Sequence, residues 1–314
     1  MSSVDLKPPR AAGRRRMARS SARRAGRFTP YLFLAPYLIL FSAFMLAPIG
    51  YGLWISLHEW DFLLPDKPWA GLSNYTELFD SSSYVADDFW KSMKATGIFT
   101  VASVPFLLVV PLGISLMLNR NFPGRNLFRG LYFLPYVLGV AVVSLLWRYL
   151  LDTNVGMVNY LSGLLGLPDG IPWTSGLPWA WIGLVAVTVW WTLGFNAVIF
   201  LAGLQDIPRE LYDAARADGA GKWDEFWHVT LPGLRPVMAF VVTITILASA
   251  NMFGQAYMIT NGQPGQETRT AIMFIAQEGL RDFRMGNAAA MGFVLAICLA
   301  LVSVVNFRLL RYRD

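Results

Sequence analysis

Few side chains in this sequence are suited to chemistry of their own. The chain has a single cysteine, Cys298, and two histidines, His58 and His228. Because Cys298 lies inside a long apolar run, we expect neither an intrachain disulfide nor a cysteine-based metal cluster. The two histidines fall in loops that hydropathy places on opposite sides of a membrane, so they are not expected to share a metal ion. The sequence therefore predicts no catalytic residue and no metal site.

A nucleotide site is not expected either. A phosphate-binding loop needs the pattern G-x-x-x-x-G-K-[ST], whose backbone amides surround the phosphates. The only Gly-Lys pair is Gly221 and Lys222; it lacks a glycine five residues before Gly221 and is followed by Trp223. The chain is therefore not expected to bind or hydrolyse ATP itself, and we expect no cofactor in it.

The long apolar runs carry hydroxyl, amide and aromatic side chains instead of charges. Such groups are costly in lipid unless they face a cavity or another helix. Lining the route of a polar, uncharged solute is one role for them, and hydrogen bonding between packed helices is the alternative. At helical spacing, two sets each share one face: Thr188, Trp191 and Thr192, and Thr245, Ser249 and Met252.

Composition shows which elements must position these residues. The chain is 55% hydrophobic and 15% charged, against about 25% charged residues in soluble domains. About 20 apolar residues are enough to cross a bilayer, and lipid favours helices because they satisfy their own backbone. We predict an all-α membrane protein with six spans at 29–55, 95–118, 130–151, 177–204, 236–259 and 286–307. Prolines inside these spans should kink them where neighbouring groups can satisfy the freed carbonyls.

Basic residues predict the orientation. Nineteen of the 26 Lys and Arg residues fall in the two terminal segments and in loops 119–129 and 205–235, and six fall in the other loops. The positive-inside rule then places both termini and the 205–235 loop in the cytoplasm. We predict a basic, disordered cytoplasmic tail at 1–27, which suits an anionic membrane surface better than nucleic acid, followed by one membrane domain at 28–314.

The loop between spans four and five has a pattern of its own, IPRELYDAARADGAGKWDEFWHVTLPGLRP at 207–236. A first helix is predicted after Pro208, with Leu211 and the Ala214–Ala215 pair at helical spacing. Gly219 should break it. An aromatic segment follows and ends near Pro232. Such a helix–turn–helix on the membrane surface offers a small-residue face and an aromatic face to a partner protein.

This loop resembles the EAA loop of permeases in ATP-binding-cassette (ABC) importers. The matching positions, with Asp213 beside them, are Glu210, Ala214, Ala215, Gly219, Phe226, Leu231 and Pro232. The glutamate stands apart from the alanine pair, as in the carbohydrate branch of that family. Weaker matches are GLSNY at 71–75, FRGLYFLPY at 128–136 and GNAAA at 286–290. The sequence departs from the family at ITNGQP, where two glycines usually precede the proline, and at Gln255, which is often Asp.

The resemblance implies the six-helix, MetI-like importer fold in the bacterial inner membrane, surrounded by membrane lipids. It implies three kinds of partner: a second, homologous permease, two ATPase subunits that bind ATP and Mg²⁺, and an extracytoplasmic sugar-binding protein. It further implies substrate contacts at Tyr136, Thr188, Trp191, Thr192, Thr245, Ser249 and Met252. The alternatives are a secondary transporter or channel without ATPase partners, and a membrane scaffold or sensor, which leaves the patterned loop unexplained.

Overall fold

The structure, a computed structural model, describes residues 29–166, 168 and 170–310. The predicted basic tail at 1–27 lies outside these residues. The chain divides into two compact units, one ending at Trp54 and the other beginning at Ile55. Among the described residues there is no strand, and the only bridge pairs are His58 with Trp69 and Asp61 with Arg284. The predicted all-α class is confirmed.

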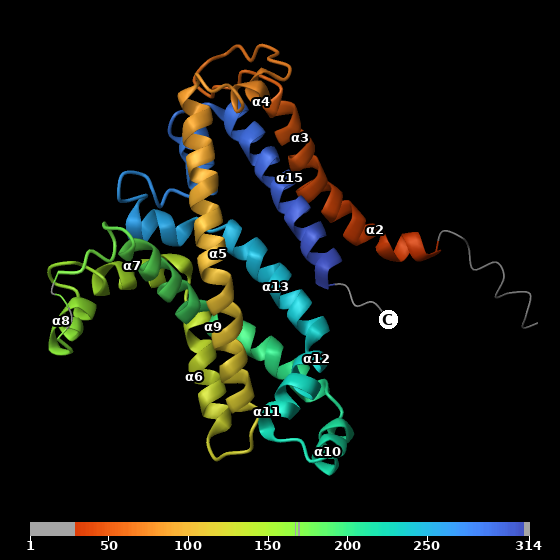
Figure 1. Cartoon of the computed structure of the whole chain (residues 1–314). Helices are drawn as coiled ribbons and strands as arrows, with labels where there is room; N and C mark the ends of the chain where they lie inside the picture. The colour runs from red at the N-terminus through yellow and green to blue at the C-terminus, as the bar shows by residue number, and fades with distance from the viewer. Residues whose placement is uncertain (1–28, 167, 169, 311–314) are drawn as a thin grey trace, which may run out of the picture. The chain divides into compact units, whose positions relative to one another are not determined.

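Helices make up both units (Figure 1). In chain order they are α2 Thr29–Phe41, the π-helical turn η1 Ser42–Leu46, α3 Ala47–Ser56, α4 Ser73–Glu77, α5 Tyr84–Leu118, α6 Arg125–Val137, α7 Val140–Leu150, α8 Met157–Leu164, α9 Trp179–Asp206, α10 Arg209–Ala217, α11 Lys222–Glu225, the π-helical turn η2 Phe226–Thr230, α12 Leu231–Gly233, α13 Arg235–Ala250, the π-helical turn η3 Ala256–Thr260, α14 Ala271–Leu280 and α15 Met285–Leu310.

Four helical segments are long and apolar enough to cross a membrane, and six are if two bent pairs each count as one span. The four are Tyr31–Ser56, Tyr84–Leu118, Trp179–Asp206 and Met285–Arg308. Their positions agree with predicted spans one, two, four and six. The second is longer than predicted because Ser83 caps it at the N-terminus, where the side chain accepts a hydrogen bond from the amide of Val85.

The other two predicted spans are not single straight helices. For 130–151 the structure has α6 and α7, which meet at 95°; Gly139 between them is extended, so the helical ladder stops there. For 236–259, α13 ends at Ala250, and the chain continues through a non-helical stretch into η3. Thr270 donates to the carbonyl of Met252 in that stretch at 2.7 Å, so this part of the backbone has a partner without a helix.

In the second unit α9 packs along α5 and α6 (Figure 1), and a buried apolar cluster joins side chains of α5, α7, α9 and η3. Pro111 lies inside α5 and cannot donate to the carbonyl of Leu107. Asn196 of α9 donates to that carbonyl instead, at 2.9 Å. A neighbouring helix therefore satisfies the carbonyl that the proline frees, and an amide side chain in the middle of α9 is accounted for by packing.

Candidate functional site

The first part of the patterned loop is a helix with a defined end. This helix, α10, ends at Ala217, and Gly219 beyond it has a left-handed conformation with φ +86°. The amide of Gly219 donates to the carbonyl of Arg216 at 3.0 Å, and the amide of Ala220 donates to the carbonyl of Ala215 at 2.9 Å. This pair of bonds is the Schellman motif, which terminates a helix with glycine just beyond the cap. The predicted break at Gly219 is confirmed.

One arginine joins the two sides of this turn. Arg216 donates through Nε to Glu225 Oε1 at 2.8 Å and through Nη1 to Asp213 Oδ1 at 3.1 Å. Asp224 Oδ2 accepts from the amide of Gly221 at 3.0 Å, at the start of α11. The two helices are therefore held together by side chains as well as by the turn.

A buried apolar cluster anchors the loop to the membrane helices. Leu204, Ile207 and Leu234 are buried together, with side chains from the end of α5 and the start of α13 packed against them. Ile207 also fills the space beside Gly233, where a Cβ atom would lie 2.9 Å from Ile207 Cδ1. Close-packed interiors transmit strain. The cluster therefore connects the loop mechanically to α5, α9 and α13.

The outer surface of the loop is open. Glu210, Asp213 and Ala214 of α10 are exposed, and Ala215 is half-buried. Glu210 lies in the first turn, where its charge complements the helix dipole. It does not cap the helix, because Pro208 stands at the N-cap and no side chain bonds there.

Large apolar side chains are also exposed along the loop. Leu211 is 50% exposed, Trp227 56% and Trp223 75%. Phe226, Leu231 and Pro232 are half-buried and lie in η2 and α12. The chain bends by 67° before it enters α13. Trp223 and Trp227 both contact the ring of Phe226, at centroid distances of 6.2 and 5.4 Å. The loop therefore exposes apolar side chains of the kind that a protein partner covers.

The predicted substrate residues form two groups, and the first surrounds the break between α6 and α7. Tyr136 stacks on Phe195 with ring centroids 4.9 Å apart and lies 6.4 Å from the ring of Trp191. Trp191 donates to the carbonyl of Leu138 at 3.0 Å. Tyr136 is 37% exposed and Trp191 is partly exposed. These two aromatic faces lie at the surface of the unit.

The hydroxyls beside them on α9 bond within the helix. Thr188 is buried and donates to the carbonyl of Leu184, and Thr192 donates to the carbonyl of Thr188, each at 2.8 Å. Both are one-turn bonds to the helix backbone, which a hydroxyl in an apolar helix makes when it has no other partner.

The second group lies on and just after α13 and is buried. Ser249 accepts a hydrogen bond from Ser103 of α5 at 3.2 Å. The hydroxyl of Thr245 has no hydrogen-bond partner among the described residues. Met252 belongs to a buried apolar cluster against which Trp191 packs. No hydrogen bond in the described chain joins the two groups; they meet through this cluster and through the packing of α13 against α9.

Sequence reasoning missed a contact between the two broken segments. A Cβ atom on Gly254 would lie 2.7 Å from Val140 Cγ2, so the segment after α13 approaches the start of α7 as closely as glycine allows. Gly254, which follows the break after α13, therefore packs against Val140, which follows the break at Gly139. The sequence signal that could have indicated this contact is the presence of glycines inside apolar runs, where they permit breaks and close packing.

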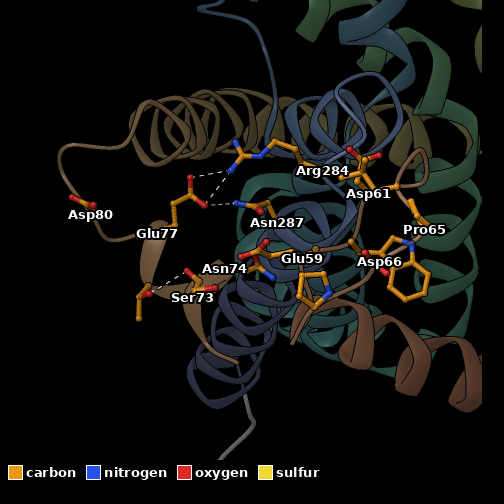
Figure 2. A pocket seen from close by; sticks show the side chains of 15 residues that line it. Glu59, Asp61, Pro65, Asp66, Ser73, Asn74, Glu77, Asp80, Arg284 and Asn287 are labelled. Atoms are coloured by element: carbon orange, nitrogen blue, oxygen red, sulfur yellow. Dashed lines mark hydrogen bonds and ion pairs between the residues drawn. The ribbon is translucent and has the colours of Figure 1, made fainter. Parts of the chain in front are cut away.

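Sequence reasoning also missed a polar cluster, which lies at the end of this unit opposite the patterned loop. Figure 2 shows Arg284 and Asn287 pointing at Glu77, with Arg284 Nη2 3.1 Å from Glu77 Oε1 and Asn287 Nδ2 2.6 Å from Glu77 Oε2. Asn74 donates to the carbonyls of Ser56 and His58, at 2.8 and 3.0 Å. The cluster borders a cavity of about 830 Å³. It joins the GLSNY and GNAAA fragments, which the sequence alone left unconnected.

Two carboxylates of this cluster titrate differently. Burial alone would raise the pKa of Glu77, but hydrogen bonds from Asn287 and Arg284 and the charge of Arg284 lower it overall. Burial raises the pKa of Glu278, and the charge of Arg284, 2.9 Å away, offsets this only in part. Arg284 is thus shared by two carboxylates, with ion pairs to Glu77 at 3.1 Å and to Glu278 at 2.9 Å.

Known proteins share this sequence and this fold. The model of a family described as "Binding-protein-dependent transport system inner membrane component" matches residues 109–314. A probable ABC transporter permease of Bacillus subtilis, YesP, is 31% identical over 299 residues, covering 94% of each chain. The arabinooligosaccharide transport system permease AraP of the same organism is 33% identical, covering 89% of this chain and 88% of its own.

A solved structure agrees over nearly the whole chain. It is a crystal structure of a bacterial ABC transporter involved in the import of the acidic polysaccharide alginate. The likeness has a TM-score of 0.77 at 25% identity and covers 94% of this chain and 98% of that one. The MetI-like permease fold and the inner-membrane location follow from these matches. This chain belongs to the family of binding-protein-dependent transport system inner membrane components.

Proposed function

We propose that this chain is the permease subunit of an ATP-driven sugar importer and that the 207–236 loop receives the force that drives it. The observation that carries the proposal is the set of exposed apolar side chains on that loop, Leu211, Trp223 and Trp227, together with the buried cluster that anchors the loop. Exposure of this kind outside the membrane favours a protein partner. Movement of that partner would be passed through the anchor to the membrane helices.

The partners follow from the chemistry that this chain lacks. Two ATPase subunits would bind ATP and Mg²⁺ and dock on the loop of this permease and of a second, homologous permease. An extracytoplasmic binding protein would deliver the sugar. In this proposal the chain itself has no catalytic site. The alginate importer whose permease this chain resembles supports an assembly of this class.

Relatives support a carbohydrate substrate. Their names specify arabinooligosaccharides, trehalose or maltose in Thermococcus litoralis, and sulfoquinovosyl glycerol in Agrobacterium fabrum. The aromatic faces of Tyr136 and Trp191 suit a sugar ring, and both are accessible at the surface of the unit. We propose that they form the substrate contacts of this chain. Thr188, Thr245, Ser249 and Met252 are buried, and in this proposal they pack behind the residues that contact the substrate and hold them in position.

The rival function is a secondary transporter or channel that needs no ATPase. A secondary transporter is expected to carry charged residues within its spans for ion coupling. Arg148 is the only Asp, Glu, Lys, Arg or His in the six predicted spans, and it is an exposed residue whose Nη1 lies 3.5 Å from the carbonyl of Met258. This composition favours the importer.

Uptake in vesicles tests the proposal. Reconstituted with its partner subunits, the wild-type chain should support sugar uptake that requires both ATP and the binding protein and that persists when ionophores collapse ion gradients. Trp191→Ala should reduce uptake by at least tenfold without loss of the assembled complex. Trp191→Phe is the matched control, since it keeps an aromatic face but loses the hydrogen bond to Leu138.

Ser249→Leu should also impair uptake, but through packing, because Ser249 is buried against Ser103. Uptake driven by an ion gradient without ATP would establish the rival function. Normal uptake by Trp191→Ala would place the substrate contacts in the second permease.

The predicted orientation is tested by labelling single cysteines in a Cys298→Ser background. A cysteine at position 75 should react with a membrane-impermeant reagent in intact cells, and a cysteine at position 219 should react only after the membrane is opened. The reason is the excess of basic residues on the side of position 219. Labelling of position 219 from outside would contradict the six-span orientation.

A further inference from the structure

A second cavity lies beside the patterned loop, at the opposite end of the unit from the Glu77 cluster. Its volume is about 980 Å³. Three parts of the chain enclose it: the end of α5 with the loop that follows, the end of α9, and the α10–η2 segment. Figure 1 shows α10, α11 and the loop after α5 at the same end of this unit. The cavity thus lies where two membrane helices end.

Positive charge dominates its lining. The two acidic residues there, Asp213 and Glu225, are both paired with Arg216, at 3.1 and 2.8 Å. Four further cations line it, and none of them makes an ion pair within the described part of the chain. They are Arg120, Arg125, Arg209 and Lys222. The recorded side-chain bond of Arg125 goes to a neutral amide, Asn121 Oδ1, at 2.6 Å. The cavity therefore has unneutralised positive charge on more than one wall.

The rest of the lining is mixed. Leu116, Leu204, Ile207 and Phe226 contribute apolar surface, and the uncharged polar residues are Asn119, Asn121, Gln205, Tyr212 and Thr230. A small inorganic anion would contact only the charged and polar part of this lining. A phosphate group attached to a hydrocarbon-bearing molecule would satisfy both parts, because guanidinium groups match phosphate oxygens and apolar side chains accept glycerol and acyl carbons.

We propose that this cavity binds the phosphate headgroup of an anionic phospholipid from the leaflet that contacts the loop. Basic pockets at the cytoplasmic ends of membrane helices have the charge and the depth that such headgroups need. The inference rests on the proposed function only through the predicted orientation. A bound headgroup would contact both α10 and the loop that follows α5. The lipid composition of the membrane would therefore affect the position of the patterned loop.

Binding is tested on the full chain purified in neutral detergent, without ATPase partners, so the result does not depend on transport. The probes are phosphatidylglycerol, phosphatidylcholine and inorganic phosphate, and native mass spectrometry measures bound lipid. Phosphatidylglycerol should bind at least tenfold more tightly than phosphatidylcholine. The double variant Arg120→Gln/Arg125→Gln should weaken its binding by more than tenfold, since each basic residue near an anionic lipid surface contributes about fivefold, or ~1 kcal/mol.

Three further variants control the test. Arg120→Lys/Arg125→Lys keeps the charge and should stay within about threefold of wild type. Arg235→Gln removes an exposed cation that lies outside the cavity at the start of α13, and should leave binding unchanged. Arg209→Gln tests a different wall and should cost about fivefold on its own, so the proposal stays testable if the double variant misfolds.

Several results would overturn the proposal. If phosphatidylcholine bound as tightly as phosphatidylglycerol, the headgroup charge would not determine binding. If Arg235→Gln lost as much lipid binding as the cavity variants, the lipid would be held by general surface charge and not by the cavity. Displacement of phosphatidylglycerol by inorganic phosphate at comparable concentration would make this a site for a soluble anion. Failure of ATP-driven uptake with intact lipid selectivity would refute the proposed function alone.

Discussion

Gly219→Asp is expected to abolish uptake while leaving the amount of chain in the membrane nearly unchanged. Gly219 forms the turn between α10 and α11 at φ +86°, and within the chain nothing lies within 4 Å of the place where its Cβ would be. An aspartate there meets no clash inside the unit, but the positive φ strains any residue with a side chain. Its effect therefore falls on the turn and on whatever docks at the loop. The measurements are uptake, co-purification of the ATPase and substrate-stimulated ATP hydrolysis in vesicles.

A matched pair separates the two physical causes at this position. Asparagine tolerates a left-handed backbone far better than a β-branched residue does. If the turn conformation matters, Gly219→Val should lose uptake and Gly219→Asn should keep much of it. If contact with the partner matters, both should lose uptake together. Normal docking, ATPase stimulation and uptake in Gly219→Asp and in Glu210→Ala would show that this loop does not couple the chain to an ATPase.

Gly286→Ala is expected to destabilise the second unit by about 3 kcal/mol, the upper end of the usual cost of overpacking. The new Cβ would lie 2.1 Å from the carbonyl oxygen of His58 and 2.9 Å from Asn74 Nδ2. Neither atom is free to move, because the amide of Asn74 already donates to the carbonyls of Ser56 and His58. The chain should accumulate at a lower level and melt at a lower temperature in detergent.

Gly292→Ala on the same helix is the matched control. Its Cβ would have no atom within 4 Å, and alanine favours a helix interior over glycine by roughly 0.5–1 kcal/mol. This variant should melt at or above the wild-type temperature. Equal melting of the two variants would mean that the close approach of α15 to the segment before α4 is not a constraint on the fold.

Local features of the sequence were enough for the class of fold and for the candidate loop. Hydrophobic length and the need to satisfy a backbone in lipid act on each span separately, and four of the six spans were placed accordingly. The helix end at Gly219 depends on one residue's access to positive φ, which is likewise a local property. The resemblance of the loop to one family was therefore readable without a structure.

Tertiary contacts decided what remained. At the breaks near Gly139 and after Ala250, partners distant in sequence, Trp191 and Thr270, donate to backbone carbonyls. Hydropathy depends only on apolar composition, so the spans predicted from it at 130–151 and 236–259 run through these breaks. Asn196 illustrates the same limit: an amide inside an apolar helix could line a solute route or bond to a neighbouring helix, and the structure shows that it donates to the carbonyl that Pro111 frees. Which groups a polar side chain meets depends on how the helices pack, and that information is not present in any single segment.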